Sequence, residues 1–105
     1  MSGKPPAFQF YASDFLVDTS SWTATQVGAY VRLLCYEWVN GGIPTTNAAL
    51  SRISGLDERN MQKCWTAVVS KKFHRDGAEM YVNLRLEEER VKQANFSKRQ
   101  AEKGF

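Results

Sequence analysis

The clearest pattern in the sequence predicts a helix from Thr23 to Asn40. Thr23 and Gln26 have the spacing of a capping box, in which two side chains satisfy backbone N–H groups at a helix start. Apolar residues then recur at helical spacing, at Val27, Tyr30, Val31, Leu34 and Trp38. Because most other positions are also apolar, we expect this helix to be central and buried all round. Gly28 within it predicts a close neighbouring backbone or ring.

Two shorter helices are predicted next. The first spans 47–54, buries Leu50 and Ile53 and ends at Gly55. Asp57 caps the second, whose apolar positions form one stripe: Met61, Cys64, Trp65, Val68 and Val69. Two helices joined by a tight turn that contains glycine are typical of a helix-turn-helix unit.

Strand-like runs lie at both ends of this helical region. Residues 8–11 alternate as a short strand does, and 14–19 is typical of a turn or a single helical turn. Residues 72–75 and 79–83 flank Asp76-Gly77, which is a hairpin signal. Three helices followed by a hairpin are the order of a winged helix.

The fold class that follows is α+β, mainly helical: a winged helix-turn-helix with a small β-hairpin wing and a C-terminal helix. We expect a flexible lead at 1–7, the winged-helix domain at 8–94 and a basic, partly mobile tail at 95–105, since the apolar positions of the last helix run out near Ala94. The predicted core is Trp22, Val27, Tyr30, Leu34, Trp38, Leu50, Ile53, Leu56, Met61, Trp65 and Val68.

Composition narrows the class of protein. The 105 residues suit one domain, and 43% of them are hydrophobic, enough for a packed core. The net charge of +3 is a mild basic excess that permits contact with phosphates without implying it.

Several classes of protein are disfavoured by what the sequence lacks. Cys35 and Cys64 lie in apolar stretches and are expected to be buried free thiols, and with His74 they fall short of the four ligands of a structural zinc site. No phosphate-cradling loop, nucleophile elbow or metal-ligand spacing is present, so we expect neither an enzyme nor a cofactor. No apolar run suits a membrane span or a signal peptide, which favours a cytoplasmic protein.

Several segments together resemble a known family. They are the run 10–19 (FYASDFLVDT) and the run 28–34 (GAYVRLL), with Trp38 and Ile43-Pro44 beyond. This combination resembles the YdaU-like prophage family, domain of unknown function 1376, over nearly the whole chain. The resemblance implies a winged-helix module of a phage or prophage replication protein. Gln26 stands where the family more often has Glu, a change that affects helix capping more than function.

The candidate binding residues are basic or polar positions on the second short helix and the hairpin. Between Asp57 and Arg75 five basic residues stand against two acidic ones. On one interpretation they contact DNA bases and phosphates; on the other they are the solvated face that any amphipathic helix needs. The predicted nucleic-acid-binding set is Arg59, Lys63, Thr66, Lys71, Lys72 and Arg75.

Three other groups of residues are weaker candidates for a site. Stacking of bases on Phe10, Tyr11, Phe15 and Trp38 is conceivable, but core packing is favoured. Asp14 and Asp18 are four residues apart and are better explained as caps or turn residues than as metal ligands. His74 is interpreted as an exposed strand residue.

The function expected is DNA binding, with duplex DNA favoured, in phage DNA replication initiation or its control. The alternative is a protein-interaction module that docks a replicative helicase, a helicase loader or a second copy of the chain. The outer face of the 57–70 helix separates the two, because a basic and exposed face favours DNA.

Overall fold

A computed structural model describes residues 6–102, with side chains through Phe96. The residues Lys98, Arg99 and Lys103, on which the basic tail was predicted, therefore lie outside the described side chains, as do residues 1–5 of the predicted lead. The fold is α+β and mainly helical, as predicted. Its elements are α1 (Ala12–Asp18), α2 (Ala24–Asn40), β1 (Ile43–Pro44), α3 (Asn47–Ser54), α4 (Glu58–Ala67), the 3-10 helix η1 (Val69–Lys72), β2 (His74–Arg75), β3 (Met80–Val82) and α5 (Leu84–Glu102).

A small antiparallel sheet has the order β1-β3-β2. The predicted hairpin is present as β2 and β3, which turn at Gly77 with a φ of +79°. The strand β1 was not predicted, because two residues ending in a proline give no alternating pattern. Its Ile43 lies opposite Tyr81 of β3 and is only 1% exposed, so the sheet contributes to the core.

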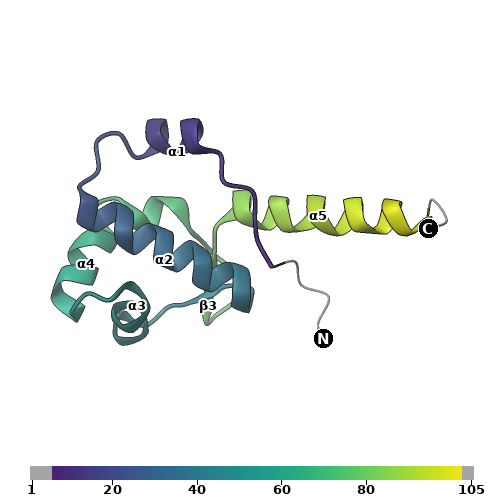
Figure 1. Ribbon diagram of the computed structural model, residues 1–105. Helices are drawn as coiled ribbons and strands as arrows, with labels where there is room; N and C mark the ends of the chain where they lie inside the picture. Colours follow the sequence, from purple (N-terminus) through teal and green to yellow (C-terminus); the bar gives the residue numbers. More distant parts are fainter. Residues whose placement is uncertain (1–5, 103–105) are drawn as a thin grey trace.

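Helix α2 is the centre of the fold, and α3 and α4 lie along one side of it (Figure 1). Its predicted capping box is present. The backbone N–H of Gln26 donates to the Thr23 hydroxyl, and the side-chain Oε1 of Gln26 accepts from the Thr23 backbone N–H at 2.9 Å. The expectation that α2 is buried all round is wrong, since Val39 is 62% exposed and Cys35 is also exposed. The expectation for Gly28 is also wrong, because a Cβ there would meet no atom within 4 Å.

The core agrees with the prediction in part. Of the predicted residues, Tyr30, Leu34, Trp38, Leu50 and Met61 are buried, while Trp22, Ile53, Leu56, Trp65 and Val68 pack against them half-buried. Val27 is half-buried and lies outside the cluster, which corrects its place in the predicted core. Buried residues that the prediction omitted include Leu33, Ile43, Val69, Phe73 and Leu86. Leu33 lies on α2 beside the predicted stripe, three residues after Tyr30, and the others lie on elements that only the tertiary fold brings together.

The segment before α2 differs from the prediction. Residues 8–11 form no strand, and 12–18 form a two-turn helix where a turn or a single helical turn was predicted at 14–19. Aromatic contacts hold this segment instead: the ring of Phe8 lies 5.3 Å from that of Trp38, and Phe15 stacks on Tyr30 at 5.8 Å. Ring packing thus provides the contacts that strand pairing was predicted to make.

A buried polar network fastens the start of α5 to the body. Asn83 is the cap of α5, since its Oδ1 accepts from the Leu86 N–H at 2.9 Å. Its Nδ2 donates to the Lys72 carbonyl at 2.8 Å and to the Tyr30 hydroxyl at 3.3 Å. Its own N–H donates to Glu37 Oε1 at 2.8 Å. One side chain and its backbone therefore join α2, η1 and α5.

Arg90 makes a second attachment about two turns further along α5. Its guanidinium donates to the Trp38 and Glu37 carbonyls, both at 3.0 Å, and lies 4.6 Å from the Trp38 ring centre. These carbonyls belong to the last turn of α2, where a cation is favourable. Beyond this clamp α5 extends away from the body (Figure 1) and continues to Glu102, past the expected end near Ala94.

Candidate nucleic-acid interface

Helix α4 is short and strongly two-sided. Asp57 caps it by accepting from the Asn60 N–H at 2.8 Å. Met61 and Cys64 are buried against the core, which turns the opposite face to solvent. That face carries four exposed polar side chains at helical spacing: Arg59, Gln62, Lys63 and Thr66. We call these four residues the α4 face.

Three of the six predicted binding residues belong to the α4 face: Arg59, Lys63 and Thr66. Neither Arg59 nor Lys63 has an ion-pair partner among the residues that the structure describes, so both charges are free to meet a phosphate or a base. The Thr66 hydroxyl donates to the Gln62 carbonyl at 3.0 Å, which leaves its oxygen lone pairs and its methyl group for other contacts.

Gln62 was missed by the sequence reasoning. It is exposed between Arg59 and Thr66, three residues from the first and four from the second. Its helical spacing is visible in the sequence, but the predicted set was chosen mainly by positive charge, and the Gln62 amide is uncharged. Glutamine can pair with adenine through two hydrogen bonds in a major groove.

The other three predicted residues follow on η1 and β2. Lys71 and Arg75 are exposed. The guanidinium of Arg75 lies 5.4 Å from the Tyr81 ring centre, which supports it on the hairpin. Lys72 is half-buried, with its ammonium 6.0 Å from the ring centre of Trp22. The predicted set therefore falls into two consecutive groups, one on α4 and one at the base of the hairpin.

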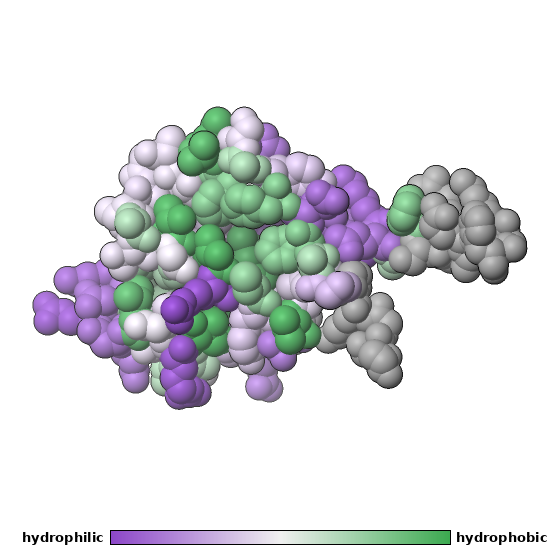
Figure 2. Space-filling model, viewed as in Figure 1, coloured by the Kyte–Doolittle hydropathy of each residue, from purple (hydrophilic) through white to green (hydrophobic). Residues whose placement is uncertain are grey.

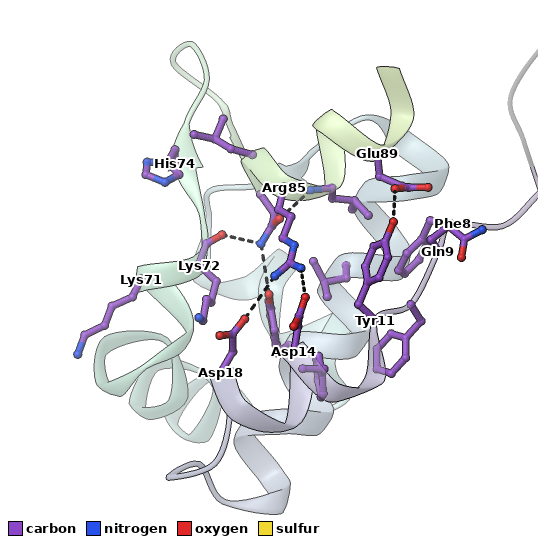
Figure 3. A pocket seen from close by; sticks show the side chains of 17 residues that line it. Phe8, Gln9, Tyr11, Asp14, Asp18, Lys71, Lys72, His74, Arg85 and Glu89 are labelled. Carbon is purple, nitrogen blue, oxygen red and sulfur yellow. Dashed lines mark hydrogen bonds and ion pairs between the residues drawn. The ribbon is translucent and has the colours of Figure 1, made fainter. Parts of the chain in front are cut away.

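A cavity of about 280 Å³ lies beside the second group, between the N-terminal segment, α1 and the start of α5 (Figure 3). Lys71 and Lys72 line it together with Asp14, Asp18 and Arg85. The two aspartates are not the caps or turn residues that we predicted: both lie in α1 and interact with Arg85, at 2.5 Å for Asp14 and 3.6 Å for Asp18. This exposed ion pair joins α1 to α5 and contributes little to stability.

The aromatic candidates divide between surface and core. Trp38 is buried at 4% exposure and Phe15 packs half-buried, as expected. Phe10 and Tyr11 are 54% and 47% exposed, so core packing was the wrong interpretation for these two. The Tyr11 hydroxyl donates to Glu89 at 3.2 Å, which links the N-terminal segment to α5.

The remaining predictions concern single residues. His74 is an exposed strand residue, as predicted, and Cys64 is buried. Cys35 was expected to be buried and is exposed instead. Among the described residues no group of three or more His, Cys, Asp or Glu could hold a metal ion. None of the described helices has the length and apolar content that a membrane crossing requires.

The comparison with known proteins gives one relative of unknown role. The chain is 33% identical over 86 residues to the uncharacterised protein YdaU of Escherichia coli K12. The match covers 80% of this chain and 28% of YdaU, so the chain spans less than a third of that protein's length. No family model and no solved structure matches. The similarity supports a YdaU-like sequence over most of the chain and assigns no activity.

Proposed function

From the similarity to YdaU, we propose that the chain belongs to the YdaU-like prophage family, domain of unknown function 1376, and is a winged-helix domain that binds DNA in phage replication initiation or its control. The order α2-β1-α3-α4-β2-β3 with β1 paired to β3 supports the winged-helix assignment. In that assignment α3 and α4 are the helix-turn-helix and β2–β3 is the wing.

The observation that carries the proposal is the α4 face, which is exposed and bears Arg59 and Lys63, neither of which forms an ion pair within the part of the chain that the structure describes. The second helix of a helix-turn-helix enters the major groove with its outer side chains toward the bases. Arg59 suits guanine, which accepts two hydrogen bonds from a guanidinium, and Gln62 suits adenine. The face would read base edges while the hairpin holds the backbone.

Phosphate contacts come in this proposal from Lys63 of the α4 face and from Lys71, Lys72 and Arg75. The hairpin turn itself carries Asp76 and Glu79, which phosphates would repel. The backbone contact is therefore placed at the base of the hairpin and not at its tip. Such contacts position a protein on DNA without specifying sequence.

The test is a titration of labelled duplex and single-stranded DNA by fluorescence anisotropy at several salt concentrations. If Lys63, Lys71, Lys72 and Arg75 each neutralise one phosphate, log affinity for duplex falls with log salt at a slope near ~−3.6. Changing Lys71 to Ala should flatten the slope by about 0.9 and weaken all sequences alike. Changing Arg59 to Ala should narrow the gap between preferred and random duplex. Lys92→Ala, an exposed cation on α5, is the matched control and should change neither.

The alternative keeps the same surface for a protein. Absence of DNA binding at low salt, together with loss of a bound replicative helicase or loader when Lys63 and Lys71 are changed, would replace DNA with protein docking as the function of the α4 face.

A further inference from the structure

A shallow apolar groove lies between α2 and α3, away from the residues assigned to DNA. Its volume is about 710 Å³. The α2 wall is formed by Val31, Cys35 and Val39, spaced four residues apart, and the α3 wall by Ala49 and Ile53 at the same spacing. Figure 2 shows apolar surface on this side of the molecule, interrupted by strongly hydrophilic side chains.

The α2 side chains at the groove are unusually exposed for a helix at the centre of a fold. Val39 is 62% exposed and the neighbouring Tyr36 is 37% exposed. Val31 and Ile53 are half-buried. The apolar side chains of each wall repeat every four residues, and the trough between the walls fits the apolar stripe of a third helix, as in helix-in-groove recognition.

The charges at the groove indicate what kind of helix would fit. Arg32 projects from α2 and Arg52 from α3, and both line the groove. Neither has an ion-pair partner among the described residues. None of the described residues that line this groove is acidic. A helix seated on the apolar floor would therefore meet two unpaired cations, which favours carboxylates at its edges.

We propose that this groove binds an acidic amphipathic helix of a partner protein. DNA suits it less, because phosphates gain nothing from the valine and isoleucine floor. A second copy of the chain also suits the groove less. On α5, the described helix that extends from the body, the positive charge of Lys92 follows the exposed carboxylate of Glu88 and offsets it. No described helix combines an apolar stripe with an excess of unpaired acidic residues. The groove and the α4 face would then serve different partners.

The experiment selects helical peptides of 20 residues from a displayed random library on the immobilised chain. The expected binders are acidic and amphipathic. Cys35 reports on their position, since it is exposed in the groove whereas Cys64 is buried. A bound peptide should slow alkylation of Cys35 in proportion to its occupancy, and alkylated chain should no longer bind it.

Charge reversal makes the test specific. Arg32→Glu and Arg52→Glu together should weaken the selected peptides at least about tenfold, and a peptide with its Glu residues changed to Lys should recover binding to that variant alone. Lys92→Glu, the same reversal on α5, should leave the affinity unchanged. Val39→Lys tests the apolar character of the α2 wall, and because Val39 is exposed the substitution should not disturb folding. Circular dichroism melting checks that every variant is folded.

Five outcomes would overturn the proposal. Four are selection of basic or uncharged peptides, binding that leaves Cys35 fully reactive, equal loss with Lys92→Glu, and concentration-dependent self-association that Arg32→Glu abolishes, which would assign the groove to a second copy. Loss of duplex DNA affinity on reversing Arg52, with peptide binding unchanged, would assign it to DNA. DNA affinity of the α4 face is measured separately, so failure of one proposal leaves the other standing.

Discussion

Changing Glu37 to Gln should remove a large part of the pH dependence of folding. Glu37 is fully buried at 0% exposure, with one carboxylate oxygen accepting from the Asn83 N–H. Burial, and then the hydrogen bond that its protonated form makes to Glu87, raise the pKa of Glu37 to about 9. Burial pulls the pKa of Glu87 upward, but hydrogen bonds from Glu37 and Arg90 outweigh it and lower that pKa. The pair therefore holds one proton, and it resides on Glu37.

The sign of the effect follows from proton linkage. The folded chain keeps a proton on Glu37 between pH 4.5 and about 9, whereas the unfolded chain has lost it above 4.5. This contribution to stability is complete below pH 4.5 and is lost as the pH rises through 9. The slope is at most about 1.4 kcal/mol per pH unit, or up to about 4 kcal/mol between pH 5 and 8. The lowered pKa of Glu87 acts below this window.

Denaturant unfolding followed by tryptophan fluorescence at pH 5.5, 7 and 8.5 measures the effect. A glutamine at position 37 keeps an acceptor for the Asn83 N–H and a donor for Glu87 but does not titrate. The stability of the variant should therefore fall less steeply than that of wild type as the pH rises. At pH 8.5 its free energy of unfolding should exceed the wild-type value by on the order of 1–4 kcal/mol. Glu88→Gln, at an exposed position on α5, should follow the wild-type profile. Parallel profiles for wild type and Glu37→Gln would refute the reasoning.

Three further predictions concern stability. Gly28→Ala should stabilise the chain by about 0.5–1 kcal/mol in thermal melts, because the new methyl meets no atom within 4 Å and α2 loses a flexible residue; destabilisation would mean a neighbour that this structure lacks. Trp65→Ala should cost about 2–3 kcal/mol, less than for a fully buried tryptophan, since Trp65 is half-buried against Phe73 and Tyr81; an unchanged midpoint in urea would remove Trp65 from the core. Arg90→Ala should cost about 1–3 kcal/mol and speed amide exchange in the last turn of α2, where two carbonyls each lose one donor and the Glu37 carbonyl keeps only the Gly41 N–H; unchanged exchange there would contradict the role of Arg90 in holding α5 to α2.

Local signals predicted the helices well because a helix is held by neighbours in the sequence. The Thr23–Gln26 capping box and the stop at Gly41 needed no knowledge of the rest of the chain. Strand β1 needed such knowledge: Ile43 and Pro44 extend only because β3 lies beside them. The same applies to residues 8–11, whose alternation suggested a strand but whose edge partner does not exist in the described fold.

Side-chain roles were harder to predict than elements. Spacing placed Arg59, Lys63 and Thr66 on one face of α4, but it could not show that Lys72 would lie over Trp22. Asp14 and Asp18 resembled turn residues until Arg85, 71 residues away from Asp14, was seen to bind both. The sequence does not single out Glu37, because a single glutamate in a helix is ordinarily solvated. Its role depends on Asn83 and Glu87, which only tertiary packing brings near.

Asn83 has a consequence for the motions of the domain. Its amide holds the last carbonyl of η1 while its Oδ1 caps α5 and its backbone N–H reaches Glu37. Fraying of α5 at its start would therefore release the Lys71-Lys72 segment in the same event, and ordering of one would order the other. Hydrogen exchange should find these two segments opening as a single cooperative unit. A partner that binds the projecting part of α5 would therefore also change the mobility of the Lys71-Lys72 segment.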